Sequence, residues 1–326
     1  MKQKVIIGFS VLLLLAVVFL IAKDLFTPST QTDENPTEYN IDKFRQIDPS
    51  KICYQEIRQF NTGMDESHGI AIDDSNYVYI TGNKQVSIFS KKGAKTGGFP
   101  IDSSAHCLTV DNNNLYLGIG NQIEHYRTSG EKIKTWNAFN TKSYLTSIAV
   151  NGDFIYATDA ENNLILKYNK AGELQLTIGK RDTAKGVEGF VIPSLYFEIA
   201  FGAFNDMWVV NPGRHRLENY SGNGELQSSW GTTSMDLEGF AGCCNPAHLA
   251  ILPNGEFVTY EKGLDRIKIY SQTGKFVCVV AGPESLTGSS DLNCSLAAIV
   301  NDLATDKDGN IYVLDANNKV MVFERK

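Results

Sequence analysis

A pattern of short strands that recurs six times limits the fold of this chain more than any other feature. Each unit has an apolar strand, a polar turn, a second strand, and a third strand that ends in an aromatic residue. Units spaced 38 to 54 residues apart are typical of stacked β-sheets, because one unit cannot bury both of its faces alone. The units begin at Gly69, Cys107, Ser147, Glu198, His248 and Asp302, and their third strands end at Phe89, Tyr126, Tyr168, Tyr220, Tyr270 and Phe323.

The two ends of the repeat region predict how the units are arranged. The sixth unit has no fourth strand, because its third strand, Lys319–Glu324, ends two residues before the chain does. A strand-like segment, Lys51–Phe60, precedes the first unit and has nothing to pair with there. An incomplete sheet would expose an edge. We therefore predict that this segment completes the last sheet and closes a ring, so that residues 51–326 form an all-β, six-bladed β-propeller.

An uninterrupted apolar run near the N-terminus predicts the compartment. The run Val5 to Ala22 has 18 residues and spans roughly 27 Å as a helix, close to the ~30 Å hydrocarbon core of a bilayer. Lys2 and Lys4 precede it, which places the N-terminus in the cytoplasm and the rest across the membrane. We predict that residues 1–23 form an uncleaved transmembrane signal anchor, with a cleaved signal peptide as the alternative. In both cases the propeller is exported, to the periplasm or the cell exterior.

The composition of the remaining chain adds three expectations. Residues 24–50 are polar and rich in proline, which is typical of a tether, although Tyr39–Phe44 packing on the propeller is the alternative. The net charge of −7 argues against a nucleic-acid partner. Six cysteines are too few for a disulfide-built scaffold, but they allow one to three bridges in an oxidising compartment.

The sixth unit carries a family signature. The run DKDGNIYVLD at 306–315, followed by Asn318-Lys319-Val320 and Phe323, resembles the repeat of NHL-type propellers. A weaker copy begins with LPNGEF at 252–257. The resemblance extends from Cys53 to Glu324 and implies the six-bladed fold. The fifth unit also resembles bacterial propeller proteins that carry a GCCNP segment, here at 242–246.

Polar side chains gather where the first strands of the units begin. In a propeller these strands line the central channel, and their starting residues lie near one mouth of it. Three of the five histidines fall at or directly before these positions, with carboxylates from two further units. We therefore predict a ligand-binding site at the channel mouth that contains His68, His106, Glu198, His248 and Asp302.

The same residues suit a metal ion. Neutral imidazoles with a carboxylate bind zinc and other divalent ions, and three ligands with an open position suit catalysis. Propellers with the NHL repeat include the peptidyl-amidoglycolate lyases, whose metal is held by histidines from separate blades near the axis. By position, the resemblance implies His68, His106 and His248 as ligands of zinc or calcium, with Glu198 or Asp302 as the catalytic base. The structural alternative is a polar channel mouth that holds only water.

The cysteines form a separate feature. Cys243 and Cys244 are adjacent, and neighbouring cysteines rarely bond to each other. We expect one of them to form a disulfide with Cys294, and Cys53 and Cys278 to be buried thiols. Free thiols or a metal site at Cys243, Cys244 and Cys294 are the alternatives.

These features support three hypotheses about function. The first is a membrane-tethered propeller that binds a protein, peptide or small ligand, and the second is a metal-dependent lyase or hydrolase acting at the channel mouth. The third is an electron-transfer or sensory accessory protein built around the cysteine pair. The sequence has no G-x-S-x-G, H-E-x-x-H, Walker or dinucleotide motif, which favours binding over catalysis.

Overall fold

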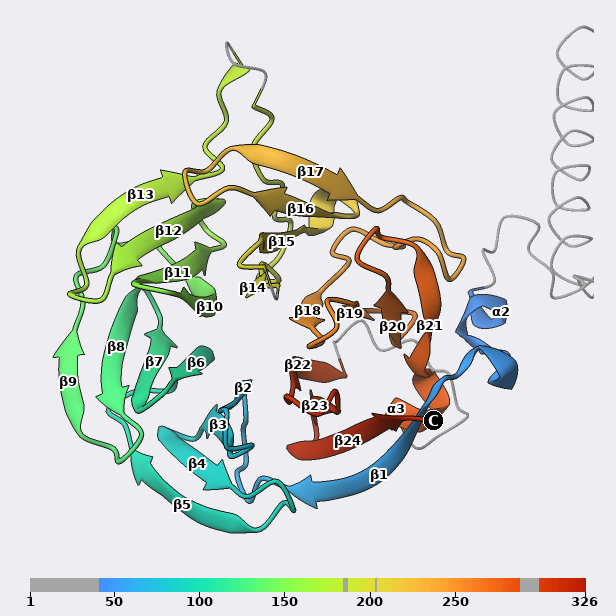
Figure 1. Cartoon of the computed structure of the whole chain (residues 1–326), viewed down its shortest axis with the longest axis horizontal. Coiled ribbons are helices and arrows are strands. Elements are labelled where there is room, and N and C mark those ends of the chain that lie inside the picture. Colours follow the sequence, from blue (N-terminus) through green and yellow to red (C-terminus); the bar gives the residue numbers. More distant parts are fainter. Residues whose placement is uncertain (1–40, 184–186, 203, 288–298) are drawn as a thin grey trace, which may run out of the picture. The chain divides into compact units, whose positions relative to one another are not determined.

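The structure, a computed structural model, describes residues 41–326 except 184–186, 203 and 288–298. Six four-stranded antiparallel sheets follow one another around a central axis (Figure 1). In blades one to five the strands run outward in chain order, so the first strand of each sheet lies nearest the axis. The six-bladed, all-β propeller predicted from the repeats is confirmed.

The strands of the first three blades are β2 (Gly69–Ile72), β3 (Val78–Gly82), β4 (Gln85–Phe89), β5 (Lys95–Pro100); β6 (Cys107–Asp111), β7 (Asn114–Ile119), β8 (Gln122–Arg127), β9 (Lys132–Thr135); and β10 (Leu145–Asn151), β11 (Phe154–Asp159), β12 (Leu164–Asn169), β13 (Leu174–Ile178). Those of the last three are β14 (Ile199–Phe201), β15 (Met207–Asn211), β16 (Arg216–Tyr220), β17 (Leu226–Trp230); β18 (His248–Ile251), β19 (Phe257–Glu261), β20 (Arg266–Tyr270), β21 (Phe276–Ala281); and β22 (Val300–Thr305), β23 (Ile311–Asp315), β24 (Lys319–Arg325), β1 (Tyr54–Asn61).

The N-terminal strand closes the ring, as predicted. β1 pairs antiparallel with β24 and forms the outer strand of blade six, with Tyr54 opposite Arg325 and Phe60 opposite Val320. It begins later than the predicted Lys51 because Pro49–Lys51 forms a short 3-10 helix. This pairing covers the edge that the chain end would otherwise leave exposed.

The hydrophobic core lies between neighbouring blades. The aromatic residues that end the third strands, such as Phe89 and Tyr270, are buried in these interfaces. Trp136 is 1% exposed and packs against Tyr116 of its own blade and Tyr168 of the next. Burial of apolar area contributes roughly 25 cal/mol per Å², so the stacking of blades stabilises a ring whose single sheets could not fold alone.

The residues that directly precede the ring pack on blade five. In the short helix α2 (Asp42–Arg45), the Arg45 guanidinium lies 2.9 Å from the carboxylate of Asp265, and both side chains are 3% exposed. Tyr260 donates a hydrogen bond to the other oxygen of Asp265, and Arg266 donates to the main-chain oxygen of Phe44. Residues 41–50 of the expected tether are therefore part of the folded body. No local sequence pattern indicates an ion pair between residues this far apart in the chain.

The other N-terminal expectations concern residues outside the described part of the chain. The signal anchor at 1–23 and the tether at 24–40 both fall there. Among the described residues, the structure contains no helix with the length and apolar character needed to cross a membrane.

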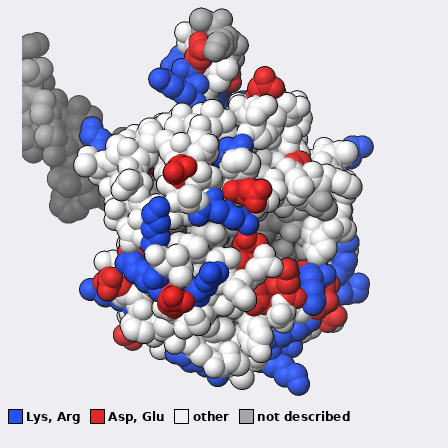
Figure 2. Space-filling model, turned by 60° about the vertical axis from the view of Figure 1, so that its left-hand side comes forward, with Lys and Arg blue, Asp and Glu red and all other residues white. Residues whose placement is uncertain are grey.

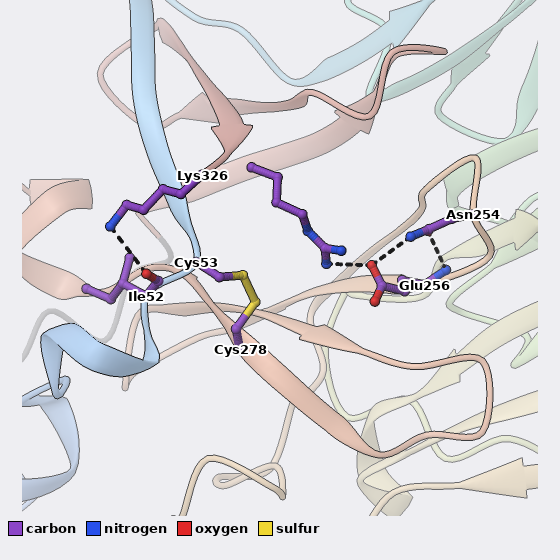
Figure 3. Close-up of a disulfide and its surroundings, with 7 residues drawn as sticks. Ile52, Cys53, Asn254, Glu256, Cys278 and Lys326 are labelled. Atoms are coloured by element: carbon purple, nitrogen blue, oxygen red, sulfur yellow. Dashed lines mark hydrogen bonds and ion pairs between the residues drawn. A yellow bond between two sulfur atoms is a disulfide. The ribbon is translucent and has the colours of Figure 1, made fainter.

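A disulfide joins the closing strand to blade five (Figure 3). Cys53, directly before β1, is bonded to Cys278 in β21, and their Cα atoms are 5.9 Å apart. The expectation that these two residues are thiols is therefore wrong. Ring closure places β1 beside the outer strand of the neighbouring blade, where the Cys53 N–H also donates to the Val279 carbonyl at 3.1 Å. Cys243 and Cys244 are free thiols, whereas their expected partner Cys294 lies outside the described residues.

Candidate functional site

A small cavity lies at the channel mouth, on the face where the inner strands begin. Its volume is ≈ 160 Å³, and every blade or the segment leading into it contributes to the wall. The structure brings all five residues of the predicted site to this one cavity. The lining residues are His68, His106, Tyr144, Thr146, Leu195, Tyr196, Phe197, Glu198, His248, Asn301 and Asp302.

The strand register explains why residues from distant repeats meet here. The starting positions of the inner strands lie opposite the ends of the second strands, as His248 lies opposite Tyr260 and Asp302 opposite Leu314. His68 and His106 lie one residue before the starting positions. Their main-chain N–H groups donate to the carbonyls of Thr81 and Gly118, and the equivalent residue of blade five is Ala247, whose N–H donates to the Tyr260 carbonyl. The two early histidines therefore lie nearer the entrance than His248.

The starting positions also join each blade to the next. Glu198 Oε2 accepts a hydrogen bond from the main-chain N–H of Leu249 at 2.6 Å. Asp302 Oδ2 accepts one from Ile70 at 2.8 Å, and Ser147 Oγ one from Ile199 at 3.4 Å. Each acceptor lies at the same position of its blade, and each donor is one residue further along in the following blade. Both carboxylates of the predicted site thus hold the inner ring together, a role that the repeat alignment did not indicate.

Glu198 also holds His248. Its Oε1 lies 2.5 Å from His248 Nδ1, while His248 Nε2 lies 3.2 Å from the carbonyl oxygen of Val300. Both ring nitrogens face oxygen acceptors, so the imidazolium, which donates from both nitrogens, satisfies the site best. Burial opposes this charge, but Glu198, Asp302 and the Val300 carbonyl outweigh it and raise the pKa of His248.

Asp302 has a different protonation balance. Burial and the negative charge of Glu198 raise its pKa to about 7, against the lowering effects of His248 and the N–H groups of Ile70 and Leu303. With this raised pKa, Asp302 is partly protonated near neutral pH, so it can donate as well as accept a hydrogen bond in the cavity. Perturbed acid groups that line a cavity are typical of functional sites, although structural ion pairs also produce them.

The entrance of the cavity is aromatic. The rings of His68 and His106 are 5.3 Å apart between centroids, and His106 is 5.0 Å from Tyr144. Burial, followed by the neighbouring His68, lowers the pKa of His106. On the opposite wall, Tyr196 contacts His248 edge-on and carries the Lys262 ammonium 4.9 Å from its ring centroid. The sequence did not indicate either tyrosine as a site residue, although Tyr144 lies three residues and Tyr196 two residues before the starting position of its blade.

The metal-ligand set implied by the resemblance differs from the group that the structure brings closest. Within the described part of the chain, Glu198, His248 and Asp302 offer ligand atoms within 4.8 Å of one another, whereas His68 and His106 are not in this group. Both nitrogens of His248 are engaged by protein oxygens, so it has no free donor for an ion in this arrangement. The donor set does not fit a metal centre as it stands.

The cysteine pair lies behind one wall of the mouth. Cys243 is exposed and Cys244 is buried, and their sulfurs are 3.1 Å apart. Burial raises the pKa of Cys244, while Ser194 and Lys262 act in the opposite direction. Ser194 is two residues from Tyr196, which lines the cavity. The pair therefore adjoins the mouth without lining it.

Comparison with known proteins identifies the fold. Neither a protein-family model nor a curated protein matches the chain. A streptogramin B lyase structure superposes with a TM-score of 0.58 at 14% identity, covering 84% of this chain and 98% of the other. Virginiamycin B lyase from Staphylococcus aureus gives 0.57 at 15% identity, covering 84% and 100%. The WD40 β-propeller domain of Doa1 gives 0.57 at 12% identity, covering 82% and 81%. Likeness at these identities establishes the propeller fold.

Proposed function

We propose that this protein is an exported, membrane-tethered propeller that binds a small polar ligand, or one side chain of a peptide or protein, at its channel mouth. The cavity lined by all six blades carries this proposal. Convergent polar groups with shifted pKa values in a concave site are the usual features of a ligand site.

The size of the cavity limits the ligand. Pockets for drug-sized molecules measure about 300–1,000 Å³, whereas this cavity measures ≈ 160 Å³. It therefore accommodates an amino-acid side chain or a molecule of that size. A larger partner would have to rest on the surrounding loops and insert a single group.

The lining indicates the chemistry of that group. Tyr144 and Tyr196 offer aromatic faces, and Glu198 and Asp302 contribute carboxyl groups to the lining. Aromatic faces and carboxyl oxygens favour a ligand group with N–H donors or a positive charge. On the face shown in Figure 2, basic and acidic side chains are interspersed, so we assign specificity to the mouth rather than to a broad charged surface.

Export rests on the N-terminal apolar run together with one structural feature. The Cys53–Cys278 disulfide suits an oxidising compartment such as the periplasm or the cell exterior, since cytosolic thiols are kept reduced. This supports the proposed extracytoplasmic location of the ring.

Thermal shift of the full chain tests the binding proposal. A panel of N-acetyl amino-acid amides and small organic amines would be screened against the wild type, His68→Ala and His106→Ala. A ligand present at 100 times its Kd stabilises the folded state by about 2.7 kcal/mol, so at least one compound should raise the Tm of the wild type but not of these variants. His125→Ala, which removes a histidine outside the cavity, is the matched control. Shifts that persist without the entrance histidines would contradict the proposal.

The second candidate is a metal-dependent lyase or hydrolase with Glu198 or Asp302 as base. The close group of Glu198, His248 and Asp302 favours it, but the hydrogen bonds that engage both carboxylates and both imidazole nitrogens weigh against it. Elemental analysis of the full chain from its native compartment separates the two functions. One bound zinc or calcium per chain, lost in His248→Ala, would favour the enzyme. Absence of stoichiometric metal, with binding that survives His248→Ala, would exclude it.

A further inference from the structure

Cys243 and Cys244 form a pair of thiols that the proposed binding function does not use. Both are free, whereas Cys53 and Cys278 of the same chain are bonded to each other. Cys243 is exposed and Cys244 is buried. A reagent in solution therefore reaches the sulfur of Cys243 directly and that of Cys244 only through its neighbour.

A turn brings the two sulfurs to the same side of the chain. Neighbouring residues of an extended strand point to opposite faces, but Cys243 and Cys244 lie in a turn. The turn follows Gly242, whose φ of 74° is in the left-handed region that favours glycine. The sulfurs are 3.1 Å apart, about 1 Å beyond the disulfide bond length of ~2.05 Å. The two thiols are therefore in direct contact before any bond forms.

The loop that carries the pair is held in place by the residues on either side of it. The buried side chain of Asn245 accepts a hydrogen bond from the Lys262 N–H at 2.7 Å and donates to the carbonyls of Ala241 and Lys262. The Ala241 N–H donates to the buried carboxylate of Glu261 at 2.7 Å. Groups that are held in contact react as parts of one molecule, which speeds bond formation between them. These contacts therefore favour reaction within the pair over reaction with a second partner.

The backbone makes a bond between these two sulfurs easy to reduce. Residues joined by a trans peptide have Cα atoms about 3.8 Å apart, below the roughly 4.4–6.8 Å that disulfides usually span. The Cα atoms of Cys53 and Cys278, which are 5.9 Å apart, lie within that range. Strained or exposed disulfides are the labile, regulatory or catalytic ones. A ring of two residues also restricts the unfolded chain little, so this bond has no role as a structural crosslink.

We propose that Cys243 and Cys244 are a reversible redox site beside the channel mouth, which exchanges between two thiols and a disulfide of adjacent residues. The oxidant is a disulfide of a small molecule or of another protein, as found in the compartments where bonds such as Cys53–Cys278 form. The site needs no ligand in the cavity, so this proposal and the binding function can fail separately.

The exchange proceeds in two steps. The Cys243 thiolate attacks the disulfide of the oxidant and forms a mixed disulfide, which releases the first thiol. The Cys244 thiolate then attacks the sulfur of Cys243 and releases the second thiol. The pair loses two electrons and two protons, and the oxidant gains them as two thiols. The exposure of Cys243 and the burial of Cys244 fix this order of attack.

Titration of the full chain in glutathione redox buffers, followed by alkylation and peptide mass spectrometry, is the first test. Trypsin releases residues 217–262 as one peptide whose only cysteines are Cys243 and Cys244. In oxidising buffers this peptide should lose two hydrogens and its two alkylated sites, and reducing buffers should restore both. Half-oxidation should need at least about tenfold more oxidising buffer, as the ratio of glutathione disulfide to squared thiol, than the Cys53–Cys278 bond needs. Two alkylated thiols in every buffer, or a bond from either residue to Cys294, would overturn the proposal.

Single variants test the order of attack in the same buffers. Cys244→Ser should accumulate a mixed disulfide of glutathione on the exposed Cys243, because no second thiol remains to displace it. Cys243→Ser, whose remaining thiol of the pair is buried, should carry neither glutathione nor an internal bond. Cys107→Ser, which removes a buried thiol outside the pair, is the matched control and should titrate like the wild type. Equal glutathione uptake by the two single variants, or none in Cys244→Ser, would refute the mechanism.

Discussion

Glu198 and His248 are joined across the boundary between blades four and five. One carboxylate oxygen of Glu198 lies 2.5 Å from His248 Nδ1, and the other accepts the N–H of Leu249 at 2.6 Å. One side chain therefore holds both the imidazole and the main chain of the next inner strand. The residue that organises the candidate site therefore also joins two neighbouring blades.

Two substitutions at Glu198 should behave differently. In Glu198→Gln the amide oxygen can accept from Leu249 while the amide N–H donates to a neutral His248, so the loss of stability should be small. Glu198→Ala leaves the buried Nδ1 of His248 and the N–H of Leu249 without partners and should cost about 3 kcal/mol. Urea unfolding measures both. Ser147→Ala, at the equivalent position with a 3.4 Å bond, is the control and should cost about 1 kcal/mol or less. Equal losses for Gln and Ala would contradict this account.

Asp302 should make the stability of the protein fall as pH rises toward neutrality. Its pKa is raised from 3.8 to about 7, so between these values the folded state binds more protons than the unfolded state and the free energy of unfolding decreases with pH. The raised pKa of His248 acts in the same direction above its ordinary value, because its favourable ion pair is lost as pH passes the folded pKa. In Asp302→Asn the free energy of unfolding should decrease less between pH 4 and pH 7 than in the wild type, and the difference should be a few kcal/mol at most. Urea titrations at several pH values test this, and an unchanged slope would count against it.

Lys268 should have the opposite effect in alkaline solution. It is fully buried, 2.9 Å from Glu261, and burial lowers its pKa from 10.5 to about 8 although Glu261 opposes the shift. Between these values the unfolded state binds more protons, so unfolding becomes less favourable as pH rises. The stability difference between wild type and Lys268→Met should therefore grow in favour of the wild type by on the order of 2 kcal/mol from pH 8 to 10. The exposed Lys275→Met serves as the charge control, and a flat difference would disprove the effect.

The Cys53–Cys278 bridge should be a major stabilising crosslink. It joins positions 225 residues apart, and closing so long a loop destabilises the unfolded chain by roughly 5 kcal/mol in the chain-entropy model. The double variant Cys53→Ala/Cys278→Ala should lose that amount in urea unfolding and should no longer respond to reductant. Cys107→Ala, which removes a buried thiol outside the bridge, should keep the response. A wild type insensitive to reductant would contradict this prediction.

The fold could be predicted because its determinants are local and repeated. Alternating apolar residues, turns such as Pro253-Asn254-Gly255, and a terminal aromatic in each third strand recur in all units. The missing last strand and the unpaired first one then required closure through β1, which the structure confirms. The gathering of polar side chains at one mouth follows from the same alignment, because equivalent positions of a ring lie at one height.

What the side chains do at that mouth depended on contacts between blades. The alignment alone could not indicate that Glu198 and Asp302 accept N–H groups from the next blade, that both nitrogens of His248 are engaged, or that Cys53 meets Cys278. The sequence by itself determined the repeat, the closure and the positions that face the axis, because these follow from periodicity along the chain. Only the tertiary structure decided which polar groups are satisfied and which thiols pair, because partners 50 to 232 residues apart meet through the packing of whole sheets.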